Sequence, residues 1–253
     1  MPAPSEIRIL ALGAFPEVTP GMDLPPLITA AATDAGVTFA PGDILVVTQK
    51  IVSKAEGALV DLRTIEPSDL AARWAAAWGK DPRQIEVVLR ESKRIVRMVN
   101  GIIISETQHG FVCANAGVDA SNVAGHDAVS LLPRDPDASA ARLRETLSAE
   151  LGFDLPVIIS DSFGRPWRYG IINVAVGLAG LGAVADYRGQ TDAHGYLLNA
   201  SILAVADELA AAAELIMGKL DGRPVAVIRG YAYEAANGTA QDLLMDPARD
   251  LFR

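Results

Sequence analysis

Short apolar runs along the chain predict its β-strands. Some runs alternate apolar with polar residues, as half-buried strands do, and others are apolar throughout, as fully buried strands are. The expected strands cover residues 7–12, 44–47, 84–89, 95–104, 157–160, 173–178, 197–205 and 224–228. The run at 157–160 leads into residues 161–168, where an acid, a hydroxyl, two arginines, Gly, Pro and Trp are crowded together. We therefore expect this strand to end in a polar turn that presents functional side chains.

Apolar residues at helical spacing predict four longer helices and a short one. These helices cover residues 24–35, 69–78, 140–151, 206–217 and 241–245. Ser139 is the expected cap of the third helix, which follows a polar, Pro-containing linker at 135–139. The acids Asp207, Glu208 and Glu214 mark the polar side of the fourth helix. Strands and helices alternate irregularly, which predicts a mixed sheet of the α/β or α+β class. We treat residues 1–253 as one domain, with the linker as a candidate boundary between two lobes.

The composition limits the function. The net charge of the 253 residues is −9. An acidic chain repels the phosphates of nucleic acids and anionic membranes, so we expect neither as a partner, and a bound phosphate has to be held by a metal ion or by a few fixed cations. Cys113 is the one cysteine, so no intrachain disulfide can form, and its apolar neighbours predict an inert buried thiol. With no secretory signal and no apolar stretch long enough to cross a bilayer, we expect a cytoplasmic protein.

Two groups of oxygen-bearing residues are candidates for a metal site. Asp161 and Ser162 supply a carboxylate and a hydroxyl side by side. Hard oxygen donors suit Mg²⁺ or Mn²⁺, with water and phosphate oxygens in the remaining positions. The segment 119–122 offers Asp119 as a further ligand and Asn122 as a donor to a phosphate or a ribose. An Asx-turn explains the same segment without any ligand.

The basic candidates are Lys50 and Lys54, which follow the strand at 44–47. On a helix, residues four apart share a face, where Lys54 could bind a nucleotide phosphate as a point charge. A solvated helix face explains the pair without a ligand. The polar loop at 186–195 contains two acids, an arginine and a histidine, and is either a functional or a surface loop. The chain has neither G-x-x-x-x-G-K-[ST] nor G-x-G-x-x-G after a strand, so a bound nucleotide would need a different kind of site.

Five blocks of the sequence resemble the coenzyme F-420-0:γ-glutamyl ligase family. They cover residues 48–57, 109–122, 161–168, 186–189 and 204–214, and they occur in the family's order. The resemblance implies a single-domain ligase with an α+β fold of mixed sheets and packed helices, unlike that of the ATP-grasp ligases. It also implies two intertwined lobes and a homodimer.

The resemblance further implies the reaction of an acid–amino-acid ligase. Members of the family use GTP to activate a carboxylate of the deazaflavin coenzyme precursor as an acyl phosphate and join L-glutamate to it, and further γ-linked glutamates can follow. Two Mg²⁺ or Mn²⁺ ions per site take part, with K⁺ as a helper ion. No covalent enzyme nucleophile is needed.

The family's motifs assign roles to residues of this chain. The implied residues are Asp119, Asp161 and Ser162 for metal, the last toward a second ion; Lys54, Arg165 and Arg168 for catalysis; and Phe15, Pro16, Glu17, Val18, Gln49, Lys50, Lys54, Asn122, Met217, Gly218, Lys219 and Asp221 for GTP.

Two positions depart from the family's pattern. Lys219 stands where many relatives carry an acid or an amide as a ligand of the second metal, and an ammonium group cannot ligate a cation. Asp221 or Glu214 could substitute, or the second metal is weakly bound. Ile171 and Ile172 are apolar where relatives are more polar. Two alternatives therefore stay open: a γ-glutamyl or amide ligase that acts on a different carboxylate, and a GTP- and metal-binding homologue without turnover.

Overall fold

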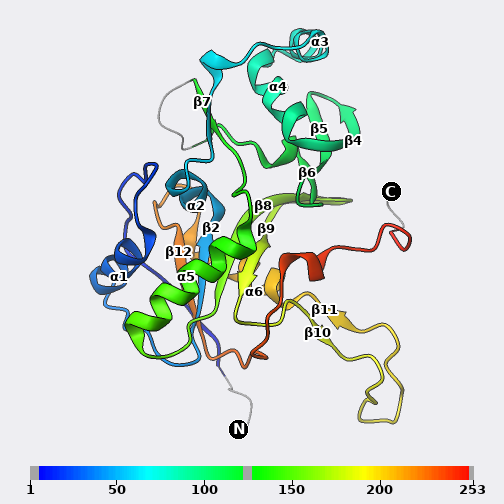
Figure 1. Ribbon diagram of the computed structural model, residues 1–253. Coiled ribbons are helices and arrows are strands. Elements are labelled where there is room, and N and C mark those ends of the chain that lie inside the picture. Colours follow the sequence, from blue (N-terminus) through cyan, green and yellow to red (C-terminus); the bar gives the residue numbers. More distant parts are fainter. Residues whose placement is uncertain (1–5, 122–126, 251–253) are drawn as a thin grey trace.

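A five-stranded mixed sheet forms the centre of the fold (Figure 1). The structure is a computed structural model that describes residues 6–121 and 127–250. The strands, in their order across the sheet, are β1 (Arg8–Ala11), β12 (Val225–Arg229), β2 (Ile44–Thr48), β8 (Val157–Arg165) and β9 (Arg168–Ala179). β2 and β8 run parallel, and the other neighbouring pairs are antiparallel. The apolar runs of β2 and β8 are fully buried, as expected for central strands.

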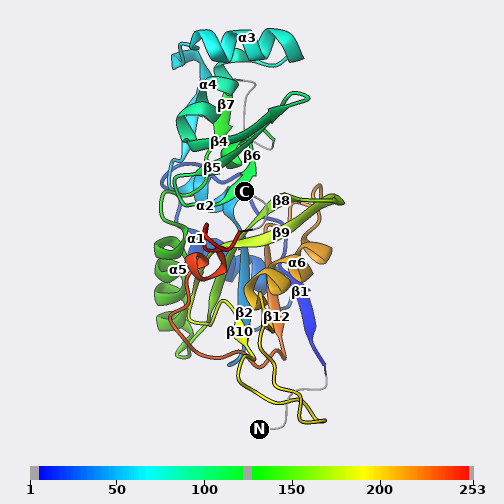
Figure 2. The same ribbon diagram turned by 90° about the vertical axis from the view of Figure 1, so that its right-hand side faces the viewer.

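Helices cover both sides of this sheet. Figure 2 shows α5 (Pro136–Leu151) and α6 (Val205–Met217) on opposite sides of β8 and β9. α1 (Leu24–Asp34) packs beside α5, and the short α2 (Gln49–Ala55) follows β2 without a loop. Their apolar side chains and those of the sheet form the main hydrophobic core. None of the helices within residues 6–121 and 127–250 is long and apolar enough to cross a membrane.

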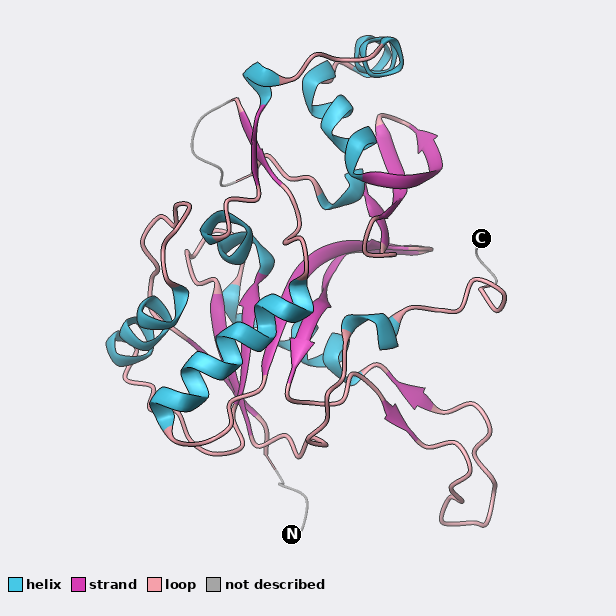
Figure 3. Ribbon diagram, viewed as in Figure 1, coloured by secondary structure: helices cyan, strands magenta, loops and turns pink. Residues whose placement is uncertain are grey.

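A second lobe is inserted between α2 and α5. Its elements are β3 (Leu59–Asp61), η1 (Leu62–Thr64), α3 (Asp69–Trp78), α4 (Pro82–Glu91), β4 (Ser92–Val99), β5 (Ile102–Thr107), β6 (Val112–Ala114), η2 (Asn115–Gly117) and β7 (Ala128–Ser130). β3 pairs with β7, and β4, β5 and β6 form a three-stranded sheet. Side chains such as Ile85, Ile103 and Val129 form a hydrophobic cluster of their own. Figure 3 shows this lobe above the main sheet, with the outer half of β8 and β9 extending beneath β6.

The remaining elements follow β9. β10 (Ala185–Asp186) and β11 (Ile202–Leu203) form a two-stranded ribbon that projects from the body of the molecule in Figure 1. The single-turn helix η3 (Ala240–Leu243) lies near the end of the chain. Mixed sheets with packed helices confirm the predicted α+β class.

Two predictions of secondary structure are wrong for one shared reason. Residues 84–89 belong to the helix α4 rather than to a strand, and residues 135–139 are not a linker, because α5 already begins at Pro136. In each case an aspartate caps the helix and proline is its first residue. The side chains of Asp81 and Asp135 accept hydrogen bonds from backbone N–H groups of the first turn. Asp135, not Ser139, is therefore the cap of α5.

Three further expectations change in extent. The segment 161–168 is not a turn, because β8 continues to Arg165 and the chain reverses only at residues 166–167. The expected strand at 95–104 is a hairpin of β4 and β5. The strand expected at 197–205 shrinks to the two residues of β11. The long β8–β9 hairpin matters most, because successive residues on it point to opposite faces.

Candidate active site

The carboxyl ends of the parallel strands β2 and β8 lie together, and both continue into polar residues. Their register pairs Thr48 with Ser160, so Gln49 and Asp161 follow at the same edge of the sheet. The Gln49 side chain is hydrogen-bonded to the Asp161 carboxylate. Its Oε1 accepts a hydrogen bond from Ser53 Oγ at 2.7 Å, which leaves the amide nitrogen for Asp161. The first turn of α2 thus orients a carboxylate on β8.

Lys50 connects this edge to the second lobe. Its Nζ donates to Asp119 Oδ2 at 2.7 Å and to the hydroxyl and carbonyl oxygens of Ser121 at 2.7 and 2.9 Å. Asp119 is fixed by backbone hydrogen bonds in both directions with Ser130 of β7. Burial raises the pKa of Asp119, but the hydrogen bonds from Lys50 and Ser121 outweigh it and hold the pKa below its usual value. Asp119 is therefore ionised and aimed at the β2–β8 edge.

Asp161 is the carboxylate with the more perturbed pKa. Burial, together with the negative charge of Asp119, raises the pKa of Asp161 to about 6, against hydrogen bonds from the Ser162 backbone and Gln49. Burial and the Asp161 charge likewise raise the pKa of Cys113 to about 12, which fits the predicted inert thiol. Two carboxylates from different lobes are thus close enough to repel one another.

Ser162 belongs to a different group of side chains, because its neighbour Asp161 points to the opposite face of the strand. Ser162 Oγ donates to Asn173 Oδ1 across the hairpin at 2.6 Å and accepts a hydrogen bond from Lys219 Nζ. Lys219 Nζ also lies 2.8 Å from Glu214 Oε1. The other oxygen of Glu214 accepts the Asn173 backbone N–H at 3.0 Å. Four side chains from β8, β9, α6 and the loop after α6 are thereby connected.

Asp207 and Glu214, on the predicted polar side of α6, both accept hydrogen bonds from β9. β9 is an edge strand, and its outward N–H groups need acceptors. Asp207 Oδ1 accepts the N–H of Ala175 at 2.9 Å, and Glu214 accepts that of Asn173. Burial raises the pKa of Asp207. The carboxylates of α6 thus accept the hydrogen bonds that the backbone of a neighbouring strand would otherwise accept. Through its bond to Glu214, Asn173 is held beside Ser162.

The N-terminal loop at residues 13–23 borders the site. Lys54 Nζ donates to Glu17 Oε1 at 2.6 Å, and the Lys54 side chain is buried. The Phe15 backbone N–H donates to the Gly222 carbonyl oxygen at 3.3 Å, which joins this loop to the one after α6. Lys50 and Lys54 share a helix, as predicted, and each is paired with a different acid. Three segments expected to bind a nucleotide therefore lie next to one another.

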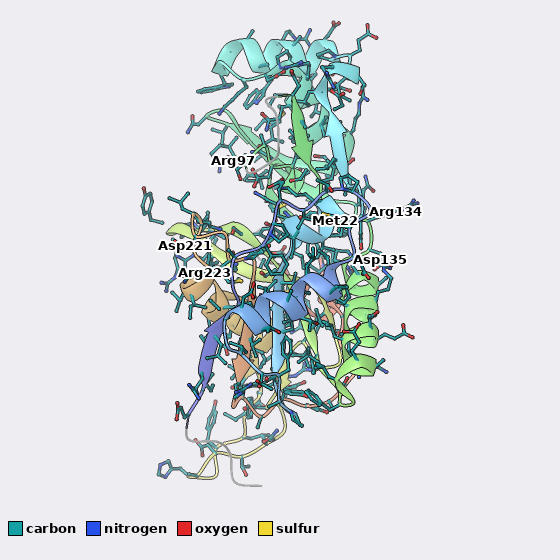
Figure 4. All side chains as sticks on the ribbon, turned by 90° about the vertical axis from the view of Figure 1, so that its left-hand side faces the viewer. Met22, Arg97, Arg134, Asp135, Asp221 and Arg223 are labelled. Carbon is teal, nitrogen blue, oxygen red and sulfur yellow. The ribbon has the colours of Figure 1, made fainter. Side chains whose placement is uncertain are left out.

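The loop after α6 begins with an unusual backbone conformation. Gly218 has φ 62° and ψ −172°, and a Cβ atom there would lie 2.7 Å from Asp221 Oδ2. Glycine is therefore required for the turn that follows the buried Met217. Figure 4 shows Asp221 and Arg223 on this loop, at one side of the N-terminal loop. Lys219 lies between the turn and Asp221 in sequence.

The two arginines of the predicted catalytic set lie at the end of the β8–β9 hairpin. Arg165 and Arg168 face each other there, four and seven residues beyond Asp161. Four residues of strand span roughly 13 Å, so these guanidinium groups are not beside the carboxylates. Arg165 Nη2 donates to the Tyr169 carbonyl oxygen at 3.0 Å. The predicted nucleotide residue Asn122 lies outside the described residues.

Comparison with known proteins gives the family. Residues 13–230 match the family of F420-0:Gamma-glutamyl ligases. The chain belongs to this family. It is 46% identical over 250 residues to the "Coenzyme F420:L-glutamate ligase" of Methanothermobacter thermautotrophicus, covering 98% of this chain and 99% of the relative. The protein of the same name from Methanopyrus kandleri is 46% identical over 252 residues, with 98% of both chains covered. That from Methanocaldococcus jannaschii is 43% identical over 213 residues, with 84% and 85% covered. The resemblance seen in the sequence blocks is confirmed.

The donor set at the two aspartates suits one hard divalent cation. In the described ranges no three His, Cys, Asp or Glu side chains converge. Asp119 and Asp161 do come together, and burial, with the charge of Asp119 as a further cause, raises the pKa of Asp161. Mg²⁺ is commonly held by one or two carboxylates, with waters and substrate phosphates completing the octahedron. The oxygens of Ser162 and Glu214, on the other face, are instead bound to Lys219.

Sequence reasoning overlooked Asn173 and the contact between Glu214 and β9. Asn173 is a buried amide at the start of an otherwise apolar run, and such an amide needs partners. That signal was present in the sequence. Nothing in the sequence marked Glu214 as an acceptor for a strand 41 residues earlier, because the contact exists only once α6 packs along β9.

Proposed function

We propose that this chain is a GTP-dependent ligase that joins L-glutamate to a carboxylate of the deazaflavin coenzyme precursor. The relatives named coenzyme F420:L-glutamate ligase support this pair of substrates. The observation that carries the proposal for the site is the pair of carboxylates Asp119 and Asp161, whose mutual repulsion a divalent cation would relieve. Phosphoryl transfer requires positive charge around the phosphate oxygens, which a bound cation and the neighbouring lysines would supply.

The proposed reaction proceeds through an acyl phosphate. A carboxylate is a poor electrophile, so one of its oxygens attacks the γ-phosphorus of GTP, the bond to the β-phosphate oxygen breaks, and GDP leaves. The amine of glutamate then attacks the acyl carbon, loses a proton, and inorganic phosphate leaves with the electron pair of the broken C–O bond. When bound, Mg²⁺ or Mn²⁺, with K⁺ as a helper ion, would neutralise the phosphate oxygens during the transfer. Further γ-linked glutamates could be added in the same way.

The residues of the site divide the remaining tasks. Asp119 and Asp161 would hold the divalent cation, Gln49 would orient Asp161, and Lys50 would keep Asp119 in place. Lys54 would donate to a phosphate oxygen in exchange for its present partner Glu17, an exposed side chain.

The two arginines of the proposed site lie further from the carboxylates. Arg165 and Arg168 at the hairpin end would have to act on a substrate that reaches beyond the carboxylates.

We include a homodimer in the proposal, supported by the exposure of Tyr169 and Ile171 at the same end. A cytoplasmic location is likewise part of it.

The experiment that tests the proposal supplies GTP, Mn²⁺, L-glutamate and a pool of carboxylate acceptors that includes the deazaflavin precursor. Mass spectrometry should find the precursor extended by one or more glutamyl residues, with one GDP released per bond. Extension of a different acceptor would favour the alternative that the chain is a ligase for another carboxylate. GTP binding without any product would favour the alternative that it is a GTP- and metal-binding homologue without turnover. Asp161→Asn should abolish product, and Asp207→Asn, which changes a buried carboxylate outside the pair, is the matched control.

A further inference from the structure

Lys219 fills the space between two oxygens that are otherwise suited to a cation. Its Nζ contacts Ser162 Oγ and lies 2.8 Å from Glu214 Oε1. The Ser162 hydroxyl donates its hydrogen to Asn173 Oδ1, so its lone pairs are left for the ammonium group. The second oxygen of Glu214 is already used by the Asn173 backbone N–H. The two oxygens that this face offers to a cation are therefore the two that Lys219 binds.

A glycine turn at the end of α6 comes directly before Lys219. α6 ends at Met217, and Gly218 turns the chain back with a conformation that a side chain would strain. Asp221 lies so close behind that a Cβ atom on Gly218 would meet it at 2.7 Å. The Lys219 side chain, which is 54% exposed, reaches from the end of the helix to Ser162 on the β8–β9 hairpin.

We propose that the Lys219 ammonium group is a tethered cation in the place of a second metal ion, so that this ligase binds one divalent cation per chain, at Asp119 and Asp161. The inference rests on the proposed function, because the single cation is the one assigned there. Lys50 contacts only one of the four carboxylate oxygens of Asp119 and Asp161, whereas Lys219 contacts both of the oxygens that Ser162 and Glu214 offer. A divalent ion cannot share both of these oxygens with an ammonium group at contact distance, since two positive charges repel strongly there. It would have to displace the lysine.

The alternation of side chains along β8 separates the two positive charges. Asp161 faces Gln49 and the second lobe, and Ser162 faces Asn173 and Lys219. One face of the strand therefore supplies the oxygens for a metal ion, and the other holds a fixed ammonium group. An ammonium group has three N–H donors, of which two are used in the structure. The third remains for an oxygen of the bound phosphate.

Counting bound Mn²⁺ tests this inference. Equilibrium dialysis of the purified protein with Mn²⁺ and a non-hydrolysable GTP analogue should give one ion per chain. Lys219→Met removes the charge and frees the oxygens of Ser162 and Glu214, so the count should rise to two, and Lys219→Gln should behave alike. Lys219→Arg keeps the charge and should stay at one. Arg223→Gln removes one positive charge from the same loop and is the matched control, which should also stay at one.

Each other result counts against the inference. Two Mn²⁺ ions in the unaltered protein would overturn it and leave the proposed function intact. One ion in both Lys219→Met and Lys219→Gln, with circular dichroism showing folded protein, would mean that Lys219 does not exclude a metal. No bound Mn²⁺ in any of the proteins would overturn the assignment of Asp119 and Asp161 and the inference with it.

Discussion

Replacing Asp161 by asparagine should raise stability while it destroys activity. The side chain is partly buried beside Asp119, and asparagine has nearly the same shape. Its carbonyl oxygen can still accept the hydrogen bond from Gln49 or from the Ser162 backbone. The substitution therefore removes mainly the negative charge. If Asp161 served only packing, its replacement by asparagine would not both stabilise the fold and abolish activity.

The size of the effect follows from the pKa of Asp161. Burial, with the charge of Asp119 as a further cause, raises that pKa from 3.8 to about 6. A shift of this size corresponds to an upper bound of about 3 kcal/mol at high pH, and relaxation of the fold reduces it to roughly 1–3 kcal/mol. Between these two pKa values the folded protein binds more protons than the unfolded chain. The contribution of Asp161 to the free energy of unfolding should therefore fall as the pH rises from about 4 to about 6, and stay low above.

Thermal and urea unfolding of both proteins, without metal, at several pH values provide the assay. At pH 8 Asp161→Asn should be more stable by roughly 1–3 kcal/mol, or about 2–4 °C per kcal/mol for a chain of this size. Below about pH 4 the difference should vanish. Millimolar Mn²⁺ should stabilise the unaltered protein and Asp207→Asn, but not Asp161→Asn. An Asp161→Asn protein that is less stable at every pH, or that still gains stability from Mn²⁺, would refute the reasoning.

Four further predictions concern three single side chains. Arg229→Met leaves the fully buried Asp43 carboxylate without its two 2.7 Å hydrogen bonds and should lower the free energy of urea unfolding by about 3 kcal/mol; a loss below about 1 kcal/mol would contradict this. Lys54→Met breaks a pair with Glu17, whose side chain is 60% exposed, and should cost less than about 1 kcal/mol of stability. The same change should weaken GTP binding in equilibrium dialysis by about tenfold, the value of one lost phosphate contact, and unchanged affinity would count against the phosphate role. Cys113, whose pKa burial raises to about 12, should react with iodoacetamide at pH 8 about 100-fold more slowly in the folded than in the unfolded protein, and rapid labelling of the folded protein would show an accessible thiol.

The fold was predictable where periodicity and local chemistry agree. The buried runs of β2 and β8 and the amphipathic α3 were expected from their patterns. α4 was mistaken for a strand because residues 84–89 are rich in β-branched residues and partly alternate. Asp81-Pro82 and Asp135-Pro136 are the same start signal, an aspartate cap with proline at the first helical position. Giving that signal precedence over alternation at 84–89, and over the polar, Pro-containing composition at 135–139, would have corrected both errors.

The site was less predictable because it depends on contacts between distant segments. Asp119 meets Lys50 from 69 residues away, and Glu214 meets Asn173 from 41. The residue types at Asp119 and Asp161 pointed to a cation, but no local pattern could pair residues from two lobes. Reading 161–168 as a turn also hid the fact that Asp161 and Ser162 lie on an extended strand, and so face opposite sides.

The most direct test of the central claim follows isotope-labelled L-glutamate into product. The protein is incubated with GTP, Mn²⁺, labelled glutamate and the deazaflavin precursor, and products are measured by mass spectrometry. The account predicts labelled precursor and an equal amount of GDP, both dependent on all four components and absent with Asp161→Asn. GDP release without incorporation of label, or full incorporation by Asp161→Asn, would contradict it.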